Sequence, residues 1–84
     1  MKVAGEINRP EGKVSIFRMN NKYIIKIERG HLEQTFKISE LDYTIVNVED
    51  AERLLDEPFM KSVLENFQKM NTELNASLSR NDFS

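Results

Sequence analysis

The stretch from Lys13 to Ser39, KVSIFRMNNKYIIKIERGHLEQTFKIS, decides the fold of this chain. Apolar and polar residues alternate along it, which is the period-2 pattern of half-buried β-strands. The pair Asn20-Asn21 interrupts the alternation, and Asn tolerates the positive φ angles that a two-residue hairpin turn requires. A glycine ten residues later interrupts it again. The stretch therefore predicts three short antiparallel strands joined by tight turns.

A turn at Asn20-Asn21 fixes the register of the first hairpin. Phe17 then faces Ile24, and the side chains divide between two faces of the sheet. One face, the core face, carries Val14, Ile16, Tyr23, Ile25 and Ile27. The other, the second face, carries Phe17, Met19 and Ile24 among Ser15, Lys22 and Lys26.

The second turn can be placed in two ways. Either Arg29-Gly30 or Gly30-His31 puts glycine at a position that can take a positive φ angle. Both placements keep three apolar residues of the following strand on the core face, namely Leu32, Phe36 and Ile38.

Charge separates the two placements. The Arg29-Gly30 turn sets Lys26 opposite Glu33, whereas the alternative sets Glu28 opposite Glu33. Opposite charges across a strand pair stabilise a sheet by ~0.2–1 kcal/mol, and like charges destabilise it by a similar amount. We therefore predict the turn at Arg29-Gly30.

The segments on either side of these strands leave alternatives open. Residues 1–12 predict either an edge strand, with Val3, Gly5 and Ile7 on one side, or a frayed terminus. The segment 43–46, Tyr-Thr-Ile-Val, is rich in β-forming residues. It predicts a fourth strand, and the other interpretation is an extended link to the helices.

Two helices are expected in the second half of the chain. Asn47 is a suitable N-cap, and the carboxylates that follow it favour the positive end of the helix dipole. Pro58 ends this helix, and Asp56 or Glu57 caps a second one, unless the two form a single kinked helix. The second helix has apolar residues with a period of 3.6, at positions 59, 60, 63, 64, 67, 70 and 74. This stripe should pack on the core face, whereas residues 75–84 lose the pattern and predict a disordered tail.

These expectations combine into an α+β domain, in which a three- or four-stranded antiparallel β-meander is packed on one face by one or two C-terminal α-helices. A chain of 84 residues forms one domain at most and buries a modest core. It has no cysteine for disulfides, and a single histidine leaves no nitrogen and sulfur ligand set for structural zinc. A partner chain is the remaining common way to stabilise so small a domain.

The charge and hydropathy of the chain argue against two classes of function, namely dedicated nucleic-acid binding and membrane association. Residues 1–46 hold eight Lys or Arg against six Asp or Glu, and residues 47–84 hold four against eight. That mild asymmetry is far from the basic footprint of a dedicated nucleic-acid binder. The chain has no run of about 18 apolar residues, and its first residues lack the apolar stretch of a secretory signal. We expect a soluble, cytoplasmic protein that does not contact membranes.

No recognisable constellation of residues supports catalysis. His31 lies in or beside a tight turn without convergent partners. The acidic residues between positions 49 and 57 match no Ca²⁺ loop, and helix-dipole stabilisation explains them. The three glycines form no phosphate loop, and the serines lack a histidine base. We therefore expect no enzymatic activity, no cofactor and no metal site.

The second face supplies the candidate interface. Phe17, Met19 and Ile24 form an apolar cluster that a small domain does not normally expose. A second copy is the commonest cover for such a cluster, because most oligomers are closed homodimers. We predict a protein-interaction module that forms a homodimer, or binds another protein, through the second face or a sheet edge.

The alternative prediction is a weak single-stranded nucleic-acid-binding domain. Basic and aromatic residues on an open sheet can neutralise phosphates and stack bases. The residues that would do so are Lys22, Lys26 and Arg18, arranged around Phe17.

Overall fold

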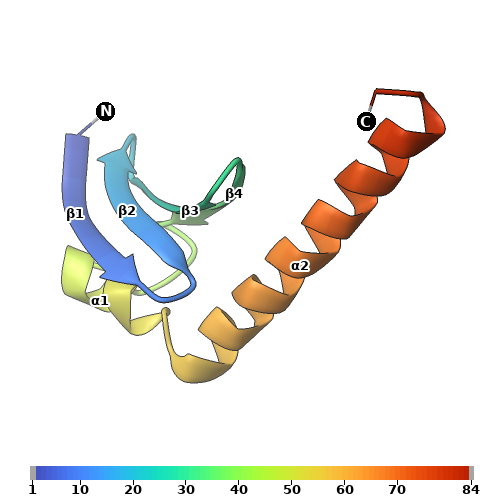
Figure 1. Cartoon of the computed structure of the whole chain (residues 1–84). Coiled ribbons are helices and arrows are strands. Elements are labelled where there is room, and N and C mark those ends of the chain that lie inside the picture. The colour runs from blue at the N-terminus through green and yellow to red at the C-terminus, as the bar shows by residue number, and fades with distance from the viewer. Residues whose placement is uncertain (1, 84) are drawn as a thin grey trace.

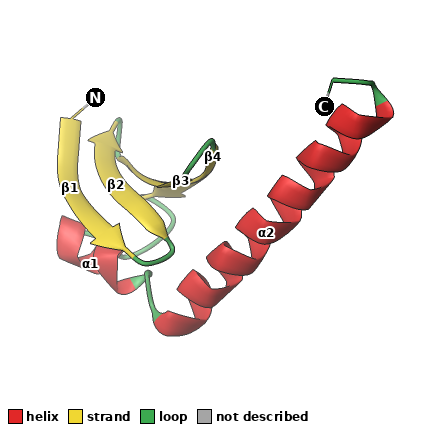
Figure 2. Cartoon of the chain, in the orientation of Figure 1, coloured by secondary structure: helices red, strands yellow, loops and turns green. Residues whose placement is uncertain are grey.

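The structure, a computed structural model, describes residues 2–83. Its elements are, in order, β1 (Lys2–Arg9), β2 (Gly12–Met19), β3 (Lys22–Arg29), β4 (Leu32–Ser39), α1 (Val48–Arg53) and α2 (Glu57–Arg80). The strands form one antiparallel sheet in the order β1-β2-β3-β4 (Figure 1). Figure 2 shows α1 behind the lower ends of β1 and β2, and α2 running obliquely at the side of the sheet. The predicted α+β meander is confirmed, and Met1 and Ser84 lie outside the described residues.

The Asn20-Asn21 turn lies where the sequence predicts it. Both residues have positive φ angles, of 51° and 62°, as a type I′ turn requires at its two central positions. Phe17 faces Ile24 across the β2–β3 pair. The predicted register of this hairpin is confirmed.

The second turn is Gly30-His31, so the prediction of Arg29-Gly30 is wrong. Gly30 has a φ angle of 61° at the first central position, where a type II′ turn needs glycine. Glu28 consequently lies opposite Glu33. Lys26 offsets their repulsion, because its Nζ lies 3.9 Å from a Glu28 oxygen and 3.3 Å from a Glu33 oxygen. Charge pairs that lie directly opposite each other do not include this diagonal cation, and for this reason they favour the wrong turn.

β1 is an ordered edge strand with a bulge near its start. The register against β2 shifts between Val3 and Gly5, as happens when a bulge inserts one extra residue. Val3 therefore faces Phe17 on the second face, whereas Gly5 and Ile7 lie on the core face. The expectation that Val3, Gly5 and Ile7 share one side is wrong at Val3.

The segment Tyr43 to Val46 is a link and not a strand, so the prediction of a fourth strand there is wrong. The N–H of Ile45 donates to the carbonyl of Tyr43 at 2.9 Å, a tight turn of the γ type that bends the backbone. Ile45 is buried, whereas Tyr43 and Val46 are 64% and 73% exposed. The link therefore anchors in the core through one side chain.

Both helices begin at the predicted caps. The Asn47 side chain accepts a hydrogen bond from the Asp50 N–H at 2.9 Å. The Asp56 side chain accepts one from the Phe59 N–H at 3.0 Å, with Pro58 in the first turn of α2. The two helices are separate, so the alternative of a single kinked helix is wrong.

α2 continues to Arg80, so the disordered tail predicted for residues 75–84 is wrong up to that residue. The Phe83 N–H donates to the Leu78 carbonyl at 2.8 Å, and Asp82 has a φ angle of 61°. This is the Schellman arrangement, which satisfies carbonyl groups of the last helical turn. Apolar periodicity does not register such a cap, and for that reason the helix was predicted too short.

Both helices contribute to one hydrophobic core on the core face. Its buried residues are Val14, Ile16, Tyr23, Ile25, Ile27, Ile45, Ala51, Leu55, Met60, Val63 and Phe67. The rings of Phe36 and Phe59 meet edge to face with centroids 5.1 Å apart. Gln34 Nε2 donates to the Val63 carbonyl at 2.9 Å. The predicted packing of the helical stripe on the core face is confirmed.

α2 is longer than the sheet surface that it covers (Figure 1). Met60, Val63 and Phe67 are buried, but residues 71–76 are all exposed, including Leu74 at 39%. At 1.5 Å per residue, residues 71–80 extend by about 15 Å, and we call them the overhang. No helix among residues 2–83 combines the length and the hydrophobicity that a membrane crossing requires.

Replacing Phe67 tests the placement of α2 on the sheet. The ring is 2% exposed, so Phe67→Ala should lower the free energy of unfolding by about 3–5 kcal/mol, through lost burial and a residual cavity. The exposed neighbour Gln68 provides the control, because Gln68→Ala should change it by less than about 0.5 kcal/mol. Urea unfolding followed by circular dichroism measures both, and a loss below about 0.5 kcal/mol for Phe67→Ala would mean that the helix faces the wrong way.

Candidate functional site

The second face brings together the three residues of the predicted interface. Phe17 faces Ile24, and Met19 lies two residues further along β2. Ile24 is only 8% exposed, Phe17 is half-buried, and Met19 is 38% exposed. Most of this cluster is therefore covered within the chain, and it offers a partner less apolar surface than its composition suggests.

The basic residues predicted to bind nucleic acid do not form one patch. Lys22 and Lys26 lie on the second face, whereas Arg18 lies opposite Tyr23 in the core-face register. Lys26 already contacts two carboxylates on its own face. A phosphate group at Lys26 would have to compete with both of them.

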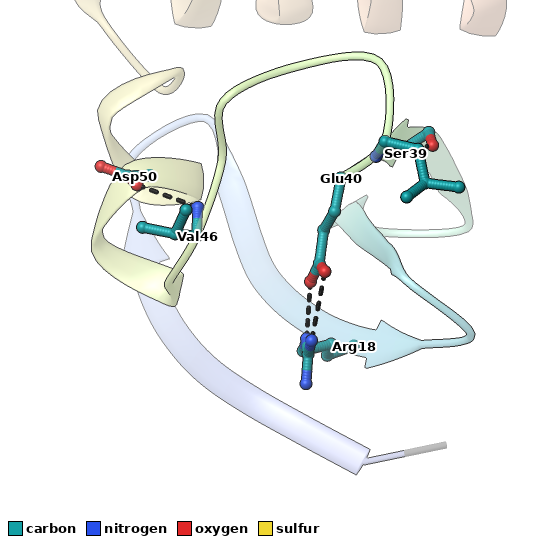
Figure 3. A network of polar contacts seen from close by, with 6 residues as sticks. Arg18, Ser39, Glu40, Val46 and Asp50 are labelled. Atoms are coloured by element: carbon teal, nitrogen blue, oxygen red, sulfur yellow. Dashed lines mark hydrogen bonds and ion pairs between the residues drawn. The ribbon is translucent and has the colours of Figure 1, made fainter.

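Arg18, near the end of β2, binds the side chain of Glu40, the residue after β4 (Figure 3). Its guanidinium nitrogens Nε and Nη2 donate to the two carboxylate oxygens of Glu40 at 2.6 and 3.1 Å. The guanidinium carbon lies 6.0 Å from the centre of the Tyr23 ring. The Glu40 N–H also donates to the Asn21 carbonyl at 2.9 Å. Glu40, the residue directly after β4, is thus bound to the first hairpin through both its side chain and its backbone N–H.

The contact between Arg18 and Glu40 shifts the pKa of both side chains. The hydrogen bonds from Arg18 lower the pKa of Glu40 below its ordinary value, and the bonds to Glu40 raise the pKa of Arg18. A carboxyl whose pKa falls on folding stabilises the folded state above its unfolded pKa, and that stabilisation disappears as the pH falls through the folded pKa.

The Glu40→Gln variant tests this contact. It should be less stable than the wild type at pH 7, because the charge-assisted hydrogen bonds are lost. Below the ordinary carboxyl pKa of 4.5, the wild type should lose stability faster than the variant until the two converge. Urea unfolding at several pH values between neutral and strongly acidic measures the difference, and parallel curves would contradict the assignment.

A further candidate site lies along β4, the strand at the other side of the sheet. Two adjoining hollows of about 530 and 400 Å³ border it. They share Lys37, Ile38 and Leu54, and are completed by Ile25, Thr35, Phe36, Asp56 and Phe59 in the first and by Tyr43 and Ile45 in the second. Because most of these side chains are apolar, we call the two hollows together the β4 groove.

Sequence reasoning missed the β4 groove because its walls come from the sheet, the link and both helices. Leu54 at the end of α1 is 39% exposed, whereas Leu55 is 4% exposed. One signal was available, since successive residues of a helix do not share a face. Two consecutive leucines at the end of a short helix therefore indicate that one of them points away from the core.

The two outer strands differ in how readily another strand can pair with them. β1 carries the bulge at Val3 and Gly5, and bulges are one way in which proteins block edge pairing. α1 also approaches β1, because a Cβ built on Gly5 would lie 3.3 Å from Val48 Cγ2. β4 pairs with β3 in an unbroken register over all eight of its residues. β4 is therefore the better template for an added strand.

Two of the acidic residues near the helix starts, Asp50 and Asp56, have structural partners. Asp50 accepts a hydrogen bond from the Val46 N–H at 3.1 Å (Figure 3). One of its carboxylate oxygens also lies 3.5 Å from Arg53 Nη1. Among residues 2–83, no group of three or more histidines or carboxylates is arranged to hold a metal ion. His31 lies exposed in the second turn.

Comparisons of the chain with protein-family models, with curated proteins and with solved structures give no match. A functional proposal therefore rests on the chain's own surface. Its most distinctive surface feature is the combination of β4 and the β4 groove.

Proposed function

We propose that this chain is a non-enzymatic protein-interaction module that forms a homodimer through β4. The observation that carries the proposal is a continuous outer strand beside an apolar groove. A strand added at a sheet edge gains main-chain hydrogen bonds, and adjoining pockets accept its side chains. An outer strand in this state is a liability that proteins manage by pairing or covering it.

The distribution of exposed apolar residues favours β4 over the second face. Four of the eight large hydrophobic residues that are exposed among residues 2–83 fall between positions 41 and 54, namely Leu41, Tyr43, Val46 and Leu54. Two of these four, Tyr43 and Leu54, line the β4 groove, and the segment as a whole follows β4 directly. The second face contributes Val3 and Met19 to the same set. Tyr43 and Leu54 are 64% and 39% exposed, and Val3 and Met19 are 51% and 38% exposed. Covering the groove therefore removes somewhat more apolar surface from water, at about 25 cal/mol per Å².

The size of the chain gives dimerisation a further role. A domain of this length buries a smaller fraction of its surface than a larger one and is marginally stable by itself. Pairing at β4 would extend the sheet and cover the groove together. The dimer would then be more stable than two separate chains.

Two lysine substitutions at equally exposed positions separate the β4 proposal from the second face. Leu54 and Met19 are 39% and 38% exposed. Leu54→Lys should raise the dimer dissociation constant by about tenfold or more, because it places an unpaired charge in the interface. Met19→Lys should leave it unchanged. Light scattering over a concentration series measures the mass, and circular dichroism checks that both variants are folded.

The opposite pattern, with dissociation in Met19→Lys alone, would place the interface on the second face. A wild-type chain that stays monomeric at every concentration would overturn the proposed homodimer. The same measurements are repeated with a mixed-sequence single-stranded oligonucleotide. Binding at low salt and release at high salt would favour the nucleic-acid function instead, since phosphate contacts are salt-sensitive.

A further inference from the structure

The sequence of β4, LEQTFKIS, is complementary to itself when read in the opposite direction. In a twofold-symmetric pair, if residue i of one copy faces residue j of the other, then residue j of the first copy faces residue i of the other. With Thr35 on the axis, Glu33 faces Lys37 of the second copy, and Lys37 faces its Glu33. We infer that β4 pairs with β4 of a second copy in this antiparallel register, an inference that rests on the proposed homodimer.

Neighbouring registers are less favourable for the same two charges. An axis at Glu33 or at Lys37 sets that residue against its own copy, so like charges face each other. An axis at Gln34 or at Phe36 leaves both charges without an opposite charge directly across the pair, and brings Glu33 and Lys37 together only at the longer diagonal distance. Registers between these would bring core-face residues opposite second-face residues, which the pleat does not allow. The axis at Thr35 is the one that pairs both charges in both copies.

The core face is matched by the same register. Leu32 faces Ile38 of the second copy, and Gln34 faces its Phe36. In the single chain all four of these side chains are only half-buried. A twofold axis perpendicular to the sheet keeps the two core faces on one side, so the pairing doubles the sheet and continues its apolar layer.

Glu33 is free to take a second cation. Its side chain is 50% exposed, and the Lys26 contact at 3.3 Å engages one carboxylate oxygen. An ionised carboxylate accepts hydrogen bonds on both oxygens. In the dimer Glu33 would lie between Lys26 of its own chain and Lys37 of the second copy.

The direction of α2 supplies an independent argument for a partner at this place. Successive turns of the helix lie beside Phe36, then Gln34, then Leu32. α2 therefore runs antiparallel to β4 and leaves the sheet at the Leu32 end. The overhang projects beyond that end, with Leu74 39% exposed.

In the Thr35 register, the Leu32 end of β4 adjoins Ile38 and the following link of the second copy. The segment between β4 and α1, which contains the link, exposes Leu41 and Tyr43, at 83% and 64%. The overhang of one copy thus reaches the exposed apolar residues of the other, and this occurs twice by symmetry. A second copy would therefore cover Leu74 of the overhang as well as Leu41 and Tyr43, which the single chain leaves exposed.

Charge exchange tests the register directly. Glu33→Lys sets lysines against lysines across the interface, and Lys37→Glu sets glutamates against glutamates. Each single variant should raise the dissociation constant by about tenfold or more. An equimolar mixture of the two variants should form heterodimers as tightly as the wild type dimerises, since every facing pair is again of opposite charge. Native mass spectrometry with one variant labelled with ¹⁵N distinguishes the heterodimer from both homodimers.

Glu28→Lys is the matched control, because Glu28 also contacts Lys26 but belongs to the inner strand β3. It should leave the dissociation constant within about twofold of the wild-type value. A loss as large as that of Glu33→Lys would mean that net charge alone weakens the dimer, and would overturn the register.

The register is also overturned if both single variants dimerise like the wild type, or if their mixture fails to form heterodimers. If Leu54→Lys dissociates the dimer while the charge variants do not, the homodimer at β4 stands and this register falls. A monomeric wild type would remove both.

Discussion

The contact on which the rest of the structure depends is the ladder of branched aliphatic side chains at the centre of the core face. Val14, Ile16, Ile25 and Ile27 are at most 1% exposed, and Val14 faces Ile27 while Ile16 faces Ile25. A slip of one residue in this pair would turn the aliphatic residues of one of the two strands toward the second face. The ladder therefore fixes the register of the inner strands and offers the helices a single apolar surface on which to pack.

Local signals were sufficient for the parts of the fold that depend on neighbouring residues. The first hairpin followed from Asn20-Asn21 and the alternation around it, and the start of α2 followed from Asp56 and Pro58. The second turn was misplaced because the deciding charge, Lys26, acts across a diagonal. The β4 groove escaped prediction altogether, since it exists only after the sheet, the link and both helices have come together.

The charged residues that suggested function in the sequence are largely engaged within the chain. Arg18 binds Glu40, and Lys26 lies between two carboxylates of the same face. The apolar residues that suggested an interface are likewise covered in part, as the low exposure of Ile24 shows. The features that remain unexplained in the single chain lie at β4, in the link and in the overhang, which is why the proposed function is placed there.

The order of the strands in the sheet is also their order in the chain, and this has a kinetic consequence. Each pair of neighbouring strands is joined by a turn of only two residues, so each pairing loses little loop-closure entropy. Proteins rich in such local pairings have low contact order and fold quickly. The contacts that span the longest stretches of sequence are those between the helices and the sheet, such as the hydrogen bond from Gln34 to Val63, and they require the link to bring distant segments together.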